Sequence, residues 1–254
     1  MQLNTLHPLD ALTLLRALPD ASVDVIISDP PYHTTQLHYD RAPMIDWAAW
    51  WREANRVVKP TGMVVLFADG LFTIDLILTN RKQYRYRLVW EKTSATGFLD
   101  ANRRPLKAHE DILIFCRTPR TSTYNPQKTA TGKQQGAAPR SNYAAAHYGQ
   151  MSARGEAWQE DGTRFPRSVL RFGSVKKQQC QHPNQKPEDL LRWLVRTYTN
   201  PGQIVLDTFA GSATTAVACL AEGRKFICCE VDVTYYTKAQ ARIAAAQADL
   251  FQPA

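Results

Sequence analysis

A mostly apolar run, Val23–Ser28, stops abruptly at Asp29-Pro30-Pro31-Tyr32. A short apolar run that is bounded by a breaker is typical of a buried strand. Open α/β sheets bind their ligands beyond the carboxyl ends of such strands. The sequence therefore predicts a sheet edge that presents a carboxylate, two prolines and an aromatic ring.

The chemistry of this tetrapeptide suits an amino group. Proline has no amide donor and fixes φ, so the backbone of Asp29-Pro30-Pro31 holds carbonyl oxygens in a rigid frame beside the Asp29 carboxylate. The exocyclic amine of a nucleobase brings two N–H donors, and Tyr32 offers a face on which the base can stack. The alternative is an Asp-Pro turn that merely ends a strand.

A second strand, turn and helix unit lies near the other end of the chain. The apolar strand Ile204–Asp207 is followed by small residues at 208–215 and by a helix-like apolar run at 216–221. Small residues let a ligand approach backbone amides at a helix N-terminus, and Glu230, which closes the next strand, can accept from ribose hydroxyls. Close packing of strand against helix is the alternative explanation of this turn.

Helical and strand-like apolar patterns alternate along the chain. Helices are expected at 9–18, 47–58, 71–78, 187–199, 213–222 and 234–247, and strands at 23–28, 62–67, 85–90, 111–116, 204–207 and 225–230. This alternation predicts an α/β fold, with a Rossmann-like, mostly parallel sheet covered by helices on both faces. A chain of 254 residues with 44% hydrophobic residues is long enough for one main domain with a sizeable core.

The net charge of +8 is concentrated between residues 117 and 181. This segment holds eleven of the 31 Lys and Arg but three of the 23 acidic residues, and it is rich in polar amides and aromatics. Such a surface suits phosphates and base edges, and the alternative is a solvated insertion whose charge aids solubility. The candidate DNA-binding residues are Arg140, Arg154, Arg164, Arg167, Arg171, Lys176 and Lys177.

Cysteine spacing and hydropathy indicate the cellular compartment in which the protein is expected. The five cysteines show no Cys-x-x-Cys spacing, so neither a disulfide framework nor a metal site is expected. The sequence has neither an apolar stretch of about 18 residues nor a secretory signal, so we expect a cytoplasmic protein without a membrane partner.

Together, the two motifs resemble those of the S-adenosylmethionine-dependent DNA amino-methyltransferases, and their order resembles the permuted beta group. The stretches that are similar to the family's other blocks lie at 9–11, 18–20, 56–62, 90–92, 109–112 and 182–187. The resemblance covers nearly the whole chain. It implies a class I methyltransferase fold with a circularly permuted motif order. Residues 1–116 and 182–254 would form the catalytic domain, and 117–181 an inserted target-recognition region.

The resemblance also implies roles for individual residues. Asp29, Pro30, Pro31 and Tyr32 would hold the target amine, and Asp29, Asp207, Phe209, Ala210, Gly211 and Ser212 would line the cofactor site. Glu230 would hold the ribose, Asp10 would lie near the adenine of the cofactor, and His182, Gln185 and Lys186 would lie beside its amino-acid end. Asp10 could instead cap the helix that follows it. The pair His109-Glu110 is interpreted as structural.

The sequence departs from the family pattern at Thr208, usually proline, and at Ala213, usually glycine. The extra Cβ at 213 is expected to crowd the cofactor's cradle.

The function that the resemblance implies is methyl transfer from S-adenosyl-L-methionine to adenine N6 of a flipped base in duplex DNA. Aspartate at the first motif position usually accompanies adenine, and cytosine N4 is the alternative. A catalytically silent DNA-binding protein and an RNA-modifying enzyme are further alternatives, whereas a nucleotide-binding oxidoreductase would leave Asp29–Tyr32 unused. Relatives often dimerise, so a homodimer is expected, and a partner endonuclease is left open.

Overall fold

The computed structural model describes residues 1–32, 44–130, 162–175, 180 and 184–249. The chain divides into two compact units, one formed by 1–125 with 168–254 and the other by 126–167. The smaller unit is therefore shorter than the basic segment 117–181 that the sequence analysis defines by its charge. In this unit β6 (Thr129–Ala130) pairs antiparallel with β7 (Thr163–Arg164), and Lys128 Nζ lies 4.8 Å from the centre of the Phe165 ring.

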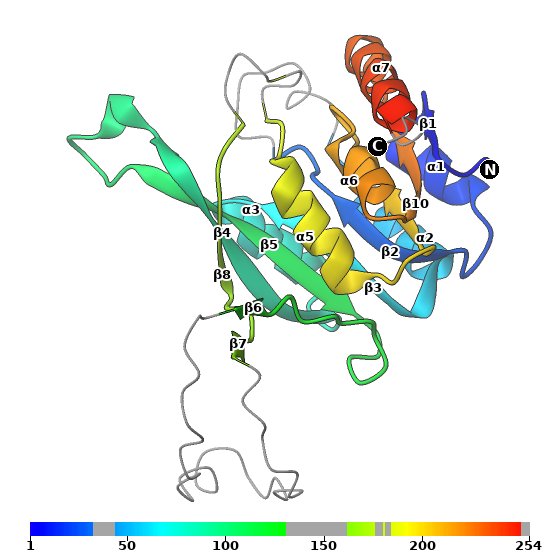
Figure 1. Cartoon of the computed structure of the whole chain (residues 1–254), viewed down its shortest axis with the longest axis horizontal. Helices are drawn as coiled ribbons and strands as arrows, with labels where there is room; N and C mark the ends of the chain where they lie inside the picture. Colours follow the sequence, from blue (N-terminus) through cyan, green and yellow to red (C-terminus); the bar gives the residue numbers. More distant parts are fainter. Residues whose placement is uncertain (33–43, 131–161, 176–179, 181–183, 250–254) are drawn as a thin grey trace, which may run out of the picture. The chain divides into compact units, whose positions relative to one another are not determined.

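Within the described residues, the larger unit is built on an eight-stranded sheet with the order β1-β10-β9-β2-β3-β5-β4-β8 (Figure 1). The pairs from β1 through β3 are parallel, β5 is antiparallel to both β3 and β4, and β8 is parallel to β4. The strands are β1 (Thr5–His7), β2 (Val23–Ser28), β3 (Val58–Ala68), β4 (Tyr84–Thr96), β5 (Lys107–Cys116), β8 (Val169–Phe172), β9 (Ile204–Asp207) and β10 (Lys225–Cys229).

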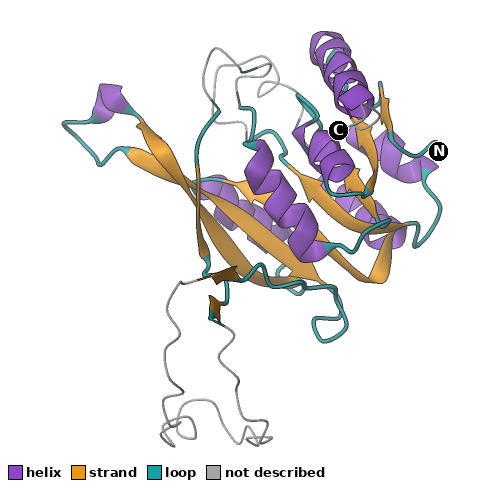
Figure 2. Cartoon of the chain, viewed as in Figure 1, coloured by secondary structure: helices purple, strands orange, loops and turns teal. Residues whose placement is uncertain are grey.

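Helices cover both faces of the sheet, as expected for an α/β fold (Figure 2). They are α1 (Ala11–Ala17), α2 (Trp47–Val57), α3 (Leu71–Thr79), α5 (Glu188–Tyr198), α6 (Thr214–Ala221) and α7 (Val233–Asp249), together with the 3-10 turn η2 (Phe98–Asp100). None of the described helices is long and apolar enough to cross a membrane.

The two faces of the central strand β2 belong to two different hydrophobic clusters. Val25 and Ile27 pack in the cluster that contains α5 and α6, whereas Ile26 packs with Leu14 of α1 and Trp50 of α2. Because both faces are buried, the centre of the strand, residues 25–27, is continuously apolar and does not alternate with polar residues. This burial fixes the register of β2 and thereby the position of the residues that follow it.

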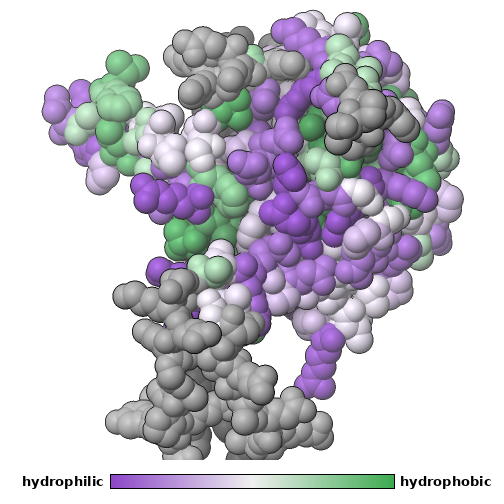
Figure 3. Space-filling view, viewed as in Figure 1, coloured by the Kyte–Doolittle hydropathy of each residue, from purple (hydrophilic) through white to green (hydrophobic). Residues whose placement is uncertain are grey.

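The antiparallel pair β4–β5 continues beyond the core as an arm that ends in η2 (Figure 1). In the space-filling view, the far end of this arm carries hydrophobic side chains beside hydrophilic ones (Figure 3). Phe98, Leu99 and Leu106 are exposed large apolar residues there.

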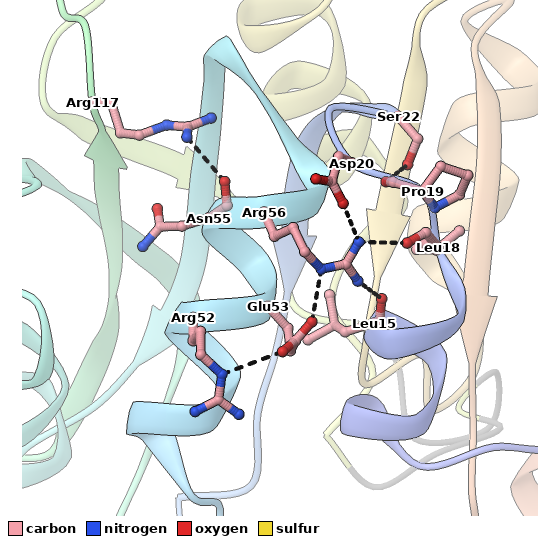
Figure 4. Close-up of polar contacts among 10 residues, drawn as sticks. All are labelled: Leu15, Leu18, Pro19, Asp20, Ser22, Arg52, Glu53, Asn55, Arg56 and Arg117. Atoms are coloured by element: carbon pink, nitrogen blue, oxygen red, sulfur yellow. Dashed lines mark hydrogen bonds and ion pairs between the residues drawn. The ribbon is translucent and has the colours of Figure 1, made fainter.

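Arg56 joins α1 to α2 behind the sheet (Figure 4). Its guanidinium donates to the Leu15 and Leu18 carbonyl oxygens at 2.9 and 2.8 Å, at the C-terminal end of α1. It also contacts Glu53 at 2.9 Å and Asp20 at 2.6 Å. Arg56 therefore caps one helix from the side of another.

Replacing Arg56 with methionine should lower the free energy of unfolding by about 2 kcal/mol, because charge-assisted hydrogen bonds to partly buried partners are lost. Urea unfolding followed by circular dichroism measures the change. Arg52→Met is the matched control, since the Arg52 side chain is 64% exposed and contacts only Glu53 among the ion pairs described. We expect less than about 0.5 kcal/mol there, and an equal loss in both variants would contradict the capping role.

Candidate functional site

The carboxyl ends of β2 and β9 lie side by side and bring the two sequence motifs together. The strands are parallel neighbours, and their ends are joined by a 2.9 Å hydrogen bond from the amide of Thr208, just after β9, to the hydroxyl of Ser28, the last residue of β2. Beyond this edge lies a cavity of about 960 Å³, within the range of ligand-binding pockets. The predicted site residues that line it are Asp10, Asp29, Pro30, Pro31, Tyr32, Gln185, Lys186, Asp207, Phe209, Ala210, Gly211, Ser212 and Glu230.

Asp29 is held on both of its carboxylate oxygens. Lys186 Nζ lies 2.7 Å from Oδ2, and the Tyr32 hydroxyl donates to Oδ1 at 2.7 Å. Burial raises the pKa of Asp29, and the Lys186 ammonium opposes this shift. The carboxylate is thus fixed in direction at the cavity wall.

Lys186 bridges two carboxylates and is almost completely buried from solvent. Its side chain is 8% exposed, and its Nζ lies 3.0 Å from Glu110 Oε2 in addition to the contact with Asp29. Burial opposes the charge of Lys186, but the two carboxylates outweigh burial and raise its pKa. Lys92 forms an ion pair with the other oxygen of Glu110, so two cations and two anions compensate one another.

Lys186 and Glu110 make a contact that the sequence does not predict. The resemblance implies that Lys186 lies beside the amino-acid end of a cofactor, and the structure places its ammonium on the carboxylate of the first motif. Glu110, interpreted from the sequence as structural, lines the cavity. The reason is strand direction: because β5 is antiparallel to β3, its first residues lie at the same sheet edge as the last residues of β3 and of β2, which is parallel to β3.

Tyr32 is half-buried at the cavity wall. Its ring stacks on Phe72 of α3, with centres 5.2 Å apart and an angle of 27° between the planes. Lys186 Nζ lies 5.6 Å from the ring centre. These contacts orient the ring while its hydroxyl reaches Asp29.

Glu230 organises the turn after β9. Its Oε2 accepts from the Gly211 amide at 2.8 Å, and its Oε1 accepts from the Asp232 amide at 2.8 Å. A carboxylate has about four lone-pair sites, so each oxygen can accept a further hydrogen bond from a ligand in the cavity. Burial raises the pKa of Glu230.

Asp207 is a buried carboxylate at the end of β9, where it accepts from the Phe209 amide at 3.0 Å. Burial raises its pKa to about 6. A carboxyl group with a raised pKa binds protons more tightly in the folded state, so stability falls as pH rises from about 4 to about 6.

Asp207→Asn should remove this loss and raise the free energy of unfolding at pH 7 by about 2 kcal/mol, because the amide keeps an acceptor oxygen without the buried charge. Urea unfolding at pH 4 and pH 7 tests this: the variant's gain should shrink at pH 4. A variant that is less stable than the unmodified protein at pH 7 would contradict this account of Asp207.

The Cβ of Ala213 lies in the core and not at the cavity wall, contrary to the expectation that it crowds a cofactor. The residue has φ 57°, the left-handed conformation that favours glycine. Its side chain is buried in the core, and Ala213 is absent from the residues that line the cavity. Alanine in place of glycine therefore strains the backbone beside the cavity, but its Cβ does not narrow the cavity.

The remaining predicted residues have mixed positions. Asp10 accepts from the Thr13 amide at 3.0 Å as the N-cap of α1, which is the alternative role that the sequence allowed, and it also lines the cavity. Arg171 lies in β8, whereas Arg164 and Arg167 belong to the smaller unit. His182, Arg140, Arg154, Lys176 and Lys177 lie outside the described residues.

The cavity fits a nucleoside whose tail carries both charges of an amino acid. Asp10, Asp207 and Glu230 supply carboxylate oxygens for hydroxyl and cationic groups. The turn at Gly211 precedes the N-terminus of α6, where backbone amides favour a carboxylate. Both kinds of partner therefore face one cavity that also contains Asp29.

Comparisons with known proteins agree with this geometry. A family model described as DNA methylase matches residues 23–241. The DNA adenine methyltransferase YhdJ of Escherichia coli K12 is 31% identical over 89% of this chain and 78% of its own length. The type II methyltransferase M.BglII of Bacillus subtilis is 29% identical over 92% of this chain and 67% of its own.

Solved structures share the fold. A complex of M1.HpyAVI with SAM has a TM-score of 0.63 at 23% identity and covers 94% of this chain and 98% of the other. The PvuII DNA methyltransferase, titled cytosine-N4-specific, has a TM-score of 0.63 at 17% identity, covering 97% and 92%.

Proposed function

This chain belongs to the DNA methylase family, and we propose that it methylates the N6 amino group of an adenine flipped out of duplex DNA. S-adenosylmethionine, the methyl donor of the family, supplies a methyl group that its positive sulfur has already activated. The observation that carries the proposal is that Asp29 and the turn around Gly211 face one cavity.

The donor would be held by the side of the cavity next to β9 and β10. Glu230 would accept from the ribose hydroxyls, because its oxygens retain lone pairs beyond those bound by Gly211 and Asp232. Phe209 and Ser212 line the same side. In this arrangement the donor and Asp29 share the cavity, which allows the methyl group and the amine to be aligned.

Asp29 would act on the target amine as an acceptor. The Lys186 ammonium beside it favours the charged form of the carboxylate, which would accept one N–H of the base, while the Pro30 carbonyl would accept the other. These hydrogen bonds favour a pyramidal nitrogen and offset the positive charge that develops on it. After transfer the nitrogen releases a proton, and burial makes Asp29 a stronger base than an exposed aspartate.

Adenine is favoured over cytosine by the residue at position 29 and by the relative in Escherichia coli that is named an adenine methyltransferase. The likeness to the cytosine-N4 enzyme is at 17% identity and concerns the fold. The target base would be extruded from the helix and stacked near Tyr32.

The test is to incubate unmethylated duplex DNA with the protein and labelled S-adenosylmethionine, digest the DNA to nucleosides and identify the labelled one. We expect N6-methyladenine, and sequencing of the product gives the recognition sequence. N4-methylcytosine without N6-methyladenine would show that the target base is cytosine and not adenine. No label in DNA from a folded protein that binds DNA would favour the catalytically silent alternative.

We further propose a cytoplasmic homodimer in which residues 117–181 select the target sequence. Two-fold symmetry would match a palindromic site, and the excess of basic residues in this segment suits phosphate contacts. Sedimentation equilibrium in the absence of DNA tests the dimer. A monomer at micromolar concentration would contradict it.

A further inference from the structure

The stem of the β4–β5 arm forms part of the cavity wall. Lys92 and Thr96 of β4 and Lys107 and Glu110 of β5 all line the cavity. The arm then continues away from the sheet (Figure 1). Whatever enters the cavity from this side passes the base of the arm.

The arm changes direction where it leaves the cavity. Glu91 pairs with His109 and Thr96 pairs with Lys107, so five steps along β4 correspond to two steps along β5. Extra residues of this kind form a bulge that bends and twists a hairpin, and bulges are common next to active sites. The bulge therefore sets the direction of the residues beyond Thr96.

Residues 97–106, which we name the hairpin tip, are closed by hydrogen bonds. Gly97 has φ 90° and permits the turn, and its carbonyl accepts from the Asp100 amide at 3.0 Å. The Asp100 carbonyl accepts from the Arg103 and Arg104 amides at 2.8 and 3.0 Å, and its carboxylate contacts the Arg104 guanidinium at 2.8 Å. The tip is thus a defined turn.

This turn displays apolar side chains in water. Leu99 is 103% exposed and Phe98 is 68% exposed, and the tip also contains two arginines and one aspartate. Leu99 is three residues beyond Thr96, so its Cα lies within about 11 Å of the cavity wall, or about three base-pair steps. An apolar wedge flanked by arginines is the chemistry that enters base steps.

We propose that the hairpin tip opens the duplex beside the target base, an inference that rests on the function proposed above. Leu99 and Phe98 enter the stack and occupy the space that the everted adenine leaves, and Arg103 contacts a phosphate. The partner is DNA and not a second copy of the chain, because the tip is basic and two side chains are far below the roughly 1,000 Å² of a stable protein interface.

The test uses the recognition sequence mapped as above, in two duplexes. In one the target adenine is paired, and in the other it faces an abasic position, so that little energy is needed to extrude it. Leu99→Ala should slow single-turnover methylation about tenfold on the paired duplex and less than about twofold on the abasic one. Leu78→Ala is the matched control, since Leu78 is 62% exposed on α3, and both rates should be unchanged.

A second variant tests the phosphate contact. Arg103→Gln should reduce the slope of log binding constant against log salt concentration by about 0.9, the value for one phosphate contact.

Three results would overturn the proposal. They are an unchanged rate for Leu99→Ala on paired DNA, an equal loss on both duplexes, and a change in the molar mass of Leu99→Ala by light scattering, which would assign the tip to contact between copies. If the unmodified protein methylates neither duplex, that result contradicts the proposed function rather than the role of the hairpin tip.

Discussion

Replacing Asp29 with asparagine is expected to slow methyl transfer by about 10²–10³-fold, the cost of removing one preorganised electrostatic group from a transition state. The amide keeps the shape of the side chain but loses the negative charge that offsets the charge on the nitrogen. It also leaves Lys186 with Glu110 as its remaining carboxylate partner among the ion pairs described. DNA binding should stay within about threefold, because phosphate contacts dominate affinity.

Single-turnover methylation and fluorescence anisotropy measure these two quantities for Asp29→Asn. Asp75→Asn is the matched control, since Asp75 is exposed on α3, and its rate should be unchanged. Retention of more than about a third of the rate by Asp29→Asn would remove Asp29 from the mechanism.

Lys186→Met is expected to have the largest combined effect on activity and stability. Removing a buried cation leaves Asp29 and Glu110 without its compensation, which typically costs about 3–5 kcal/mol of stability. The pKa of Asp29, already raised by burial, should rise further because the opposing charge is gone. At a given pH a larger fraction of the carboxyl group is then protonated, so activity should fall about a hundredfold and recover as pH increases.

The pH profile separates this role of Lys186 from a merely structural one. A purely structural defect would lower the rate at every pH, whereas loss of charge compensation moves the profile towards alkaline pH. The double variant Lys186→Met with Glu110→Gln should regain part of the lost stability, because without Lys186 the carboxylates of Asp29 and Glu110 share only the charge of Lys92, and the second change removes one of them. Lys82→Met, at an exposed lysine, is the control. An unshifted profile and no regain of stability would contradict the account.

The elements that form the core could be predicted from the sequence. Strands β2 and β9 and the helices on both faces are apolar runs whose period reports their burial, and the structure confirms the α/β fold. The three-residue strand β1 is too short to show a period. The outer parts of β4 and β5 are exposed and polar, so no apolar pattern marks them. Strand β8 lies within the basic segment, and the sequence does not predict it.

The site was predictable where a motif is local and not where it depends on strand direction. Asp29 and Gly211 follow buried strands, so the sheet edge on which they lie could be inferred. Glu110 reaches that edge because β5 runs antiparallel to β3, and an alternating pattern of strands and helices favours parallel strands. The effect of Ala213 depends on which way its Cβ points, and this follows from the backbone angle of the turn.

The most direct test of the central claim, that Asp29 presents an adenine amine to the methyl donor, is sequencing of modified bases in cellular DNA. Cells that lack other adenine methylation would express either the unmodified chain or Asp29→Asn at equal level. We predict N6-methyladenine at one sequence motif in the first culture and its near absence in the second. Equal methylation in both cultures, or none in the first with folded protein present, would contradict the claim.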